Sequence, residues 1–207
     1  MPKPYEVIGD GFRRPRTPAV RDNSRHQWEK NRARRPKPER AGSGATERDT
    51  GLGTGDLVFS AKYRETGAPR ELAELFGVPE GTALVERTYR TRCATESAPF
   101  GLVTSYLVRD MLAGNPDLLD DGKEPWPGGT QSQLFTVGIE VDRIEERVTA
   151  RPPTPEEARV LELPPGTSVL VLRKTSYDTQ DRAVDITDIT LPGDRTELVF
   201  TTSLERW

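Results

Sequence analysis

The chain contains one short phrase twice, and this repeat limits the folds that it can adopt. Residues 78–91 read VPEGTALVERTYRT, and residues 163–177 read LPPGTSVLVLRKTSY. Gly81 in the first phrase matches Gly166 in the second at an offset of 85 residues. The repeat predicts two copies of one structural unit.

The residues around each phrase predict what that unit contains. Before the first phrase, GAPRELAELFG has Leu72, Leu75 and Phe76 at helical spacing, and Gly77 ends the helix. After it come a strand in ALVERTYRTRC, a polar hairpin in ATESAP and a second strand in FGLVTSYLV. The first copy is therefore predicted to be helix, strand, hairpin, strand.

The second copy predicts the same order with a stronger helix signal. Thr154 is a good N-cap, Pro155 suits the first helical position, and Glu157 completes a capping box. The strand SVLVLRKTSY, the hairpin DTQDRA and the strand VDITDITL follow. Two such copies predict an α+β domain with a central antiparallel sheet, helices packed on it, and an internal pseudo-repeat.

Three further segments complete the predicted domain. Residues 57–63, LVFSAKY, alternate as a strand does. Between the copies, SYLVRDMLAGNP has apolar residues at helical spacing, PDLLDDGKEPWPGG predicts a loop, and TQSQLFTVG predicts a short helix. IEVDRIEERVTA then predicts a strand.

Charge divides the chain near residue 55. Residues 1–55 hold 13 Lys and Arg against 7 Asp and Glu, with few aliphatic residues, whereas residues 56–207 hold 17 against 26. A segment with little apolar surface cannot offset the entropy cost of ordering. We therefore expect residues 1–55 to be a basic, flexible linker or arm, and residues 56–207 to be the domain.

The basic arm and the lack of long apolar runs limit the partners of the chain. The run RARRPKP at residues 32–38 can neutralise DNA phosphates, but alone it would bind only weakly and with steep salt dependence. No apolar run is long enough to span a bilayer, and no apolar secretory signal opens the sequence. We expect a cytoplasmic protein without a membrane partner.

The residues that usually carry catalysis are scarce. The one histidine, His26, lies in the basic arm, and Cys93, the one cysteine, is interpreted as a small apolar filler. The acidic clusters lack metal-ligand spacing, and GLGTG at residues 51–55 follows no strand, so it is interpreted as a linker. We expect no enzyme activity, no catalytic residue, no metal and no cofactor.

Several strings, taken in order, resemble a known family. LAELFGVPEGTALV, APFGLVTSYL, GIEV, RVTARPPTPEEARVLELPPGTSVLVL and LPGDRTELVF resemble the UTRA effector-binding domain of the HutC subfamily of GntR transcriptional regulators, over residues 56–207. HQWEKNRAR resembles the linker that follows the winged helix-turn-helix in such regulators, although no such DNA-binding domain precedes it here. The chain is either a fragment or a stand-alone sensor.

The resemblance implies a fold, a function and a set of site residues. The fold would be that of chorismate lyase, with the two copies around one small-molecule pocket and a homodimer formed through the domain. Matched positions place the ligand-binding residues at Arg87, Tyr89, Tyr106, Thr130, Arg151, Lys174 and Asp188. An excess of cationic groups there would favour an anionic effector.

Other interpretations of these residues and of the function stay open. Arg151 could pair with an acidic neighbour, Tyr106 could belong to the core, and Asp185 and Asp188 need not face the same way. The function implied is control of DNA binding by a small-molecule effector. Two alternatives are an enzyme of the chorismate lyase type and a ligandless dimerisation partner of full-length regulators.

Overall fold

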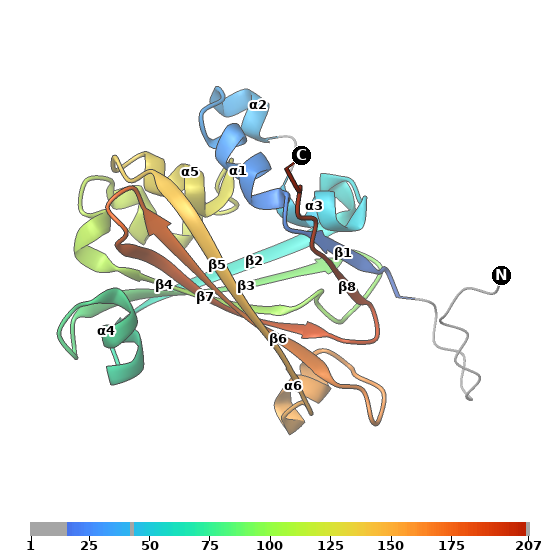
Figure 1. Cartoon of the computed structure of the whole chain (residues 1–207). Coiled ribbons are helices and arrows are strands. Elements are labelled where there is room, and N and C mark those ends of the chain that lie inside the picture. Colours follow the sequence, from blue (N-terminus) through green and yellow to red (C-terminus); the bar gives the residue numbers. More distant parts are fainter. Residues whose placement is uncertain (1–15, 42–43, 206–207) are drawn as a thin grey trace.

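Six antiparallel strands form the central sheet of the computed structural model, which describes residues 16–41 and 44–205 (Figure 1). Their order across the sheet is β2-β3-β4-β7-β6-β5. The strands are β2 (Leu57–Gly67), β3 (Ala83–Cys93), β4 (Leu102–Val108), β5 (Val141–Arg151), β6 (Val169–Asp178) and β7 (Ala183–Pro192).

The predicted pseudo-repeat is present, and each copy is one strand longer than predicted. The first copy is β2, α4 (Arg70–Phe76), β3 and β4, and the second is β5, α6 (Pro155–Val160), β6 and β7. The two copies meet where β4 pairs with β7, so the strand order is symmetric about the middle of the sheet. The predicted α+β class with a central antiparallel sheet is confirmed.

The start of α6 agrees with the sequence in detail. Thr154 Oγ1 accepts a hydrogen bond from the Glu157 amide at 3.2 Å, and the Glu157 carboxylate accepts one from the Thr154 amide at 2.7 Å. Pro155 occupies the first helical position. The predicted capping box is therefore confirmed.

The connector between the copies differs from the prediction at its start. The helical spacing expected over SYLVRDMLAGNP belongs instead to the end of β4 and a 3-10 turn, Arg109–Leu112. Pairing with β7 as far as Tyr106 and with β3 as far as Val108 holds this segment extended, so tertiary contacts override the local pattern. Two more 3-10 turns, Pro116–Leu119 and Asp121–Lys123, lead to the predicted short helix, α5 (Gly129–Phe135).

The segment before β2 is folded where the structure describes it, although the sequence predicts a flexible arm. It contains β1 (Ala19–Asp22), α1 (Arg25–Ala33), α2 (Lys37–Ala41), α3 (Ala45–Thr50) and a 3-10 turn, Thr54–Asp56. β1 pairs in parallel with β8 (Thr196–Val199), the last strand of the chain. Residues 1–15 lie outside the described residues.

Charge pairing explains why a segment with so few aliphatic residues is ordered. Lys30 of α1 and Arg34, the residue that caps its end, lie 3.0 and 2.9 Å from Glu140, which follows α5. The helix thus gains its partners from the acidic part of the chain rather than from an apolar core of its own. The sequence shows the opposite charges but not that they meet.

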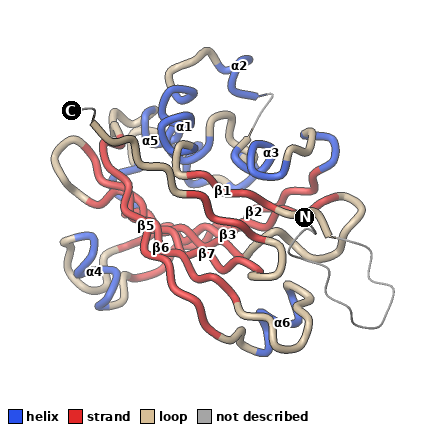
Figure 2. The backbone as a smooth tube through the Cα atoms, turned by 45° about the vertical axis from the view of Figure 1, so that its right-hand side comes forward, coloured by secondary structure: helices blue, strands red, loops and turns tan. Residues whose placement is uncertain are grey.

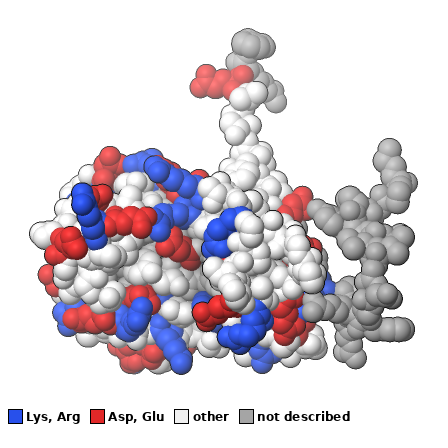
Figure 3. Space-filling view, turned by 90° about the horizontal axis from the view of Figure 1, so that it is seen from below, with Lys and Arg blue, Asp and Glu red and all other residues white. Residues whose placement is uncertain are grey.

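The two faces of the sheet are covered differently (Figure 2). α1, α3 and α5 lie over one face, and α4 and α6 lie on the other. Leu72, Ala73 and Phe76 of α4 pack against Leu84 of β3 and Ile186 of β7. Figure 3 looks onto the α4 and α6 side, where basic and acidic side chains are interspersed.

Candidate functional site

A cavity of about 280 Å³ lies between the sheet and the helices that cover its first face. Its floor comes from strands of both copies, namely Phe59, Tyr89, Thr91, Val103, Ser105, Lys174, Thr187 and Ile189. Its cover comes from the segment before β2 and from the connector around α5. The cavity is therefore lined by both copies of the repeat and by two segments outside the repeat, the one before β2 and the connector.

The floor crosses the centre of the pseudo-repeat. Tyr89 and Lys174 occupy matched positions of the two copies, 85 residues apart, and both line the cavity. Between them, Ser105 of β4 lies directly opposite Thr187 of β7. The two copies of the repeated phrase thus each supply one side of the cavity floor.

On the β6 side, Lys174 neutralises a buried carboxylate. Its Nζ lies 3.0 Å from Asp185 Oδ2, and Asp185 is fully buried. Ser105 and Thr187 donate hydrogen bonds to Asp185 Oδ1 at 2.6 and 3.0 Å. Burial raises the pKa of Asp185, but Lys174 and the hydroxyl donors outweigh it, so the net pKa lies below its ordinary value. Lys174 and Asp185 therefore form an ion pair.

On the β3 side, a buried cation fixes the connector to the sheet. Arg87 donates to Gln133 Oε1 at 2.7 Å and to the carbonyl oxygen of Leu118 at 2.6 Å, and it is fully buried. Gln133 in turn donates to Glu124 Oε1 at 2.8 Å. The guanidinium also lies 4.7 Å from the centre of the Tyr63 ring. Arg87 thus holds the cover of the cavity in place.

Tyr89 presents its hydroxyl group to the cavity within the same network. Its Oη lies 3.2 Å from Glu124 Oε1 and 3.2 Å from the Tyr63 hydroxyl. Burial raises the pKa of Tyr89 well above its ordinary value, Arg87 lowers it, and Glu124 raises it further. The phenol is therefore neutral at physiological pH and serves as a hydrogen-bonding group.

The cover brings two paired arginines to the cavity. Arg25 pairs with Asp49 of α3 and lies 3.7 Å from Glu29, and Arg21 lies 3.8 Å from Asp49 and 3.9 Å from Glu146. Burial and the neighbouring Arg25 lower the pKa of Arg21 to about 10, against the opposing effect of Asp49 and Glu146. The Arg21 guanidinium group stays charged at physiological pH, and both arginines have carboxylate partners.

Arg32 of α1 is the cation of the cavity lining with no such partner. Its side chain lies over the Trp28 ring, 4.8 Å from the ring centre, and the residue is 7% exposed. Within the described residues no carboxylate oxygen lies within 4.0 Å of its nitrogens, and Nε is buried without a hydrogen-bond partner. This arrangement leaves a nearly buried positive charge in the lining of the cavity.

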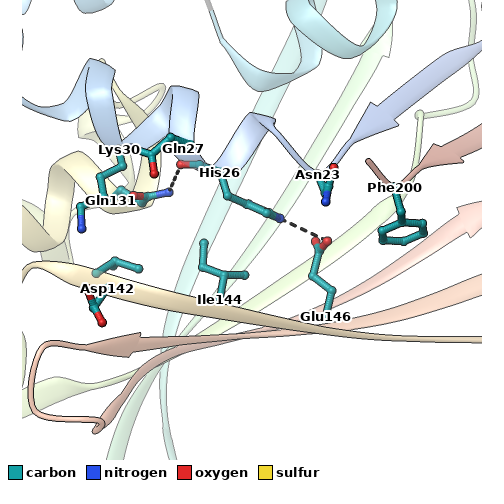
Figure 4. Close-up of a pocket in the computed structure, with 10 residues that line it drawn as sticks. Asn23, His26, Gln27, Lys30, Gln131, Asp142, Ile144, Glu146 and Phe200 are labelled. Atoms are coloured by element: carbon teal, nitrogen blue, oxygen red, sulfur yellow. Dashed lines mark hydrogen bonds and ion pairs between the residues drawn. The ribbon is translucent and has the colours of Figure 1, made fainter. Parts of the chain in front are cut away.

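A second hollow, of about 390 Å³, lies beside the first between α1 and β5 (Figure 4). His26 and Gln131 line both. His26 Nε2 lies 3.1 Å from Glu146 Oε2, and Gln131 donates to the His26 carbonyl oxygen at 3.1 Å. The sequence predicts that His26 lies in a flexible arm outside the domain. The structure corrects this prediction, because His26 contacts Glu146 of β5.

The structure brings together only part of the predicted site. Tyr89, Thr130 and Lys174 line the cavity, and Arg87 lies beside it under the connector. The remaining three predicted residues are Tyr106, Arg151 and Asp188, and none of them lines it.

Each of these three residues has other contacts. Tyr106 packs in the core beneath α4, on the opposite face of the sheet. Asp188 accepts hydrogen bonds from Arg173 at 2.6 and 2.9 Å. Arg151 pairs with Glu157 through two hydrogen bonds of 2.7 Å, the acidic-neighbour alternative that the sequence left open.

The residues that the sequence did not indicate come mainly from the segment before β2. Arg21, Arg25, His26 and Arg32 line the cavity, as does Asp49. The sequence contains one indication of the Arg32 position, because Trp28 and Arg32 are four residues apart and would therefore be neighbours on a helix. This spacing is informative only if the segment is known to be helical, and its composition does not show that.

Two features are absent from the described residues. They contain no group of three or more His, Cys, Asp and Glu side chains that could hold a metal ion. None of their helices combines the length and the apolar character that crossing a membrane requires.

Comparisons with known proteins agree on one family. The sequence profile of the UTRA domain matches residues 60–197. An uncharacterized HTH-type transcriptional regulator of Streptomyces coelicolor is 30% identical over 119 residues, which is 57% of this chain and 43% of that protein. The match thus spans less than half the length of that relative.

Two solved structures share the fold. The effector domain of PhnF from Mycobacterium smegmatis has a TM-score of 0.60 at 20% identity, over 72% of this chain and 89% of that one. PhnF itself, from the same organism, has a TM-score of 0.62 at 19% identity, over 93% of this chain and 74% of that one. At these identities the likeness concerns the fold alone.

Proposed function

Because the chain belongs to the UTRA domain family, we propose that it is the ligand-sensing and dimerisation domain of a GntR-type transcriptional regulator of the HutC subfamily. In this proposal a small-molecule effector binds in the cavity, and its binding controls the attachment of the regulator to DNA. The relatives named as an HTH-type regulator and as an effector domain support this role.

The observation that carries the proposal is the composition of the cavity. A floor of rigid strands from both copies offers hydroxyl groups and an ion pair, and two other segments close over it. Small-molecule sites typically combine a concave shape with a few convergent polar groups on rigid elements. The cover includes α1 and α3, which lie outside the residues matched by the family profile, so a bound ligand would contact the segment before the domain.

A metabolite screen by differential scanning fluorimetry tests ligand binding. A ligand at about 100 times its dissociation constant should stabilise the protein by about 2.7 kcal/mol. Replacing Thr187 with Val, which keeps the shape but removes a hydroxyl group from the floor, should reduce the response. A screen in which no compound raises the unfolding temperature would favour the ligandless dimerisation partner instead.

The enzyme alternative needs a direct assay, because His26 and Glu146 lie together in the second hollow, beside the cavity. Incubation with chorismate, with absorbance of the product as the readout, tests the chorismate lyase type. We expect no turnover above buffer. Turnover that is lost on replacing His26 with Gln would establish an enzyme and overturn the regulatory proposal.

Self-association is a separate part of the proposal. Light scattering after size exclusion should give twice the mass of the 23.1 kDa chain. A monomer at micromolar concentration would remove dimerisation from the proposal and leave ligand sensing in place. Any binding of this chain to DNA should be weak and should disappear at physiological salt, since Arg21 and Arg25 already have carboxylate partners.

A further inference from the structure

We infer that Arg32 is the anion-binding residue of the cavity, so that the ligand carries a carboxylate or phosphate group that docks beneath α1. This inference rests on the proposed function, because it assumes that the cavity between the sheet and its cover binds a small molecule. It adds the charge of the ligand and a contact residue outside residues 60–197, the span of the family match.

The charge balance of the cavity singles out Arg32. Three other cations line the cavity, and each has a carboxylate near it. Lys174 lies 3.0 Å from Asp185, Arg21 lies 3.8 Å from Asp49, and Arg25 lies 3.7 Å from Glu29. Arg32 alone among these four lacks a carboxylate within 4.0 Å in the described part of the chain.

The position of Arg32 makes the missing partner costly. The residue is 7% exposed, and a guanidinium group remains protonated at any physiological pH. A charge removed from water needs a counter-charge or a full set of hydrogen bonds. The Trp28 ring, 4.8 Å away, offers a cation–π contact to one side but accepts no hydrogen bond in the guanidinium plane. Glu29 and Glu47 act on Arg32 electrostatically without a direct contact, so a ligand oxyanion would supply the hydrogen-bonding partner that the described residues do not.

The chemistry of the guanidinium group defines the class of ligand. Its planar set of donors matches the two oxygens of a carboxylate or the oxygens of a phosphate. Across the cavity the floor offers neutral or neutralised groups, including the Tyr89 phenol and the Lys174–Asp185 pair. The ligand is therefore expected to have one anionic end under α1 and a polar, uncharged remainder against the strands.

The test compares anions with neutral counterparts. Inorganic phosphate and glycerol 3-phosphate, each against potassium chloride at equal ionic strength, should raise the unfolding temperature of the wild type, and glycerol should not. Phosphate affinity is then measured by calorimetric titration on the Arg32→Met variant. We expect it to fall by at least about tenfold, the loss that a charged hydrogen-bonding partner typically causes. Arg35→Met, an exposed position three residues further on, is the matched control and should bind as the wild type does.

The unliganded proteins provide a second readout. If Arg32 serves the ligand, Arg32→Met should unfold at the same temperature as the wild type or higher, because an unpaired buried charge has been removed. A clear drop in that temperature would show that Arg32 serves the fold, and would overturn the inference. Arg32→Lys, which keeps the charge, should retain a weaker phosphate response, and it replaces the Met variant if that variant does not fold.

The remaining outcomes separate this inference from the proposed function. If neutral metabolites stabilise the wild type while no anion does, the cavity binds ligands and the role of Arg32 is wrong. An Arg32→Met variant that binds phosphate as tightly as the wild type would also overturn the role of Arg32. If no compound of either kind has any effect, both the proposed function and the role of Arg32 fail.

Discussion

Glu157 serves two neighbours at the start of α6. Its carboxylate accepts a hydrogen bond from the Thr154 amide and pairs with both terminal nitrogens of Arg151. The Arg151 hydrogen bonds lower the pKa of Glu157 to about 2, against the opposing effect of burial. We predict that Glu157→Gln lowers the free energy of unfolding by at most about 1 kcal/mol at pH 7, because Gln can keep the hydrogen bond from the Thr154 amide but loses the charge that pairs with Arg151.

The pH dependence of this loss follows from the direction of the pKa shift. A carboxyl group whose pKa is lower in the folded state stabilises the protein above its unfolded pKa of about 4.5. Wild type and variant should therefore differ most above about pH 5 and converge as the pH falls toward 2. Urea unfolding at a series of pH values measures this, and a constant difference would show that Glu157 stays protonated or unpaired.

The ion pair in the cavity floor gives a second prediction at this scale. Lys174→Met leaves Asp185 fully buried without its cation, although the hydroxyl donors of Ser105 and Thr187 remain. The free energy of unfolding should fall by about 3 kcal/mol, the usual cost of breaking a buried pair from one side. Lys62→Met, at an exposed position of β2, is the control and should have almost no effect. Equal effects of the two substitutions would contradict the pairing.

Whether a predicted site residue lines the cavity depends on which face of the sheet its side chain occupies. Neighbouring residues on a strand point to opposite faces, so Ser105 lines the cavity and Tyr106 packs beneath α4. Likewise Lys174 faces the cavity, and Arg173 pairs with Asp188 on the other side. The resemblance to a family indicated the right strands, but the face of each residue depends on the register between strands, which one sequence does not show.

At the scale of elements, the turn between β7 and β8 depends on a glycine. Gly193 donates a hydrogen bond to the Ser168 carbonyl oxygen at 3.0 Å, and a Cβ at this position would lie 2.5 Å from that oxygen. We predict that Gly193→Ala shifts the backbone and lowers the free energy of unfolding by about 1 to 3 kcal/mol. Thermal unfolding measures the loss. Gly55→Ala, where a Cβ meets no atom within 4 Å, is the control.

Elements were predictable where their causes are local. The capping box of α6 consists of two residues three positions apart, Thr154 and Glu157, and the sequence therefore predicts it correctly. The apolar spacing at the end of β4 suits a helix as well as a strand, and pairing of Leu107 and Val108 with β3 decides for the strand. α1 is stabilised by Lys30 and Arg34 against Glu140, more than a hundred positions away. No local pattern reports such a partner.

At the scale of the whole molecule, a ligand in the cavity should stabilise segments far apart in the sequence together. α1, α3, the connector and five strands of the central sheet all contribute to the lining. We predict that a stabilising ligand slows amide hydrogen exchange in α1 and α3 by at least about tenfold, since a bound ligand disfavours local opening of whatever covers it. Mass spectrometry of exchanged peptides measures this. Protection confined to the strands would show that the cover does not contact the ligand.

The pairing of β1 with β8 has a consequence for the order of folding. Only four residue pairs join these strands, yet they come from opposite ends of the described chain (Figure 1). Closing so long a loop costs more chain entropy than forming any hairpin in the sheet, and contacts of such high order are expected to form late. They are expected to open early for the same reason, with few contacts to resist separation. β1 leads directly into α1, which covers the cavity. Separation of β1 from β8, the reverse of the last folding step, would therefore open the cavity to an entering ligand.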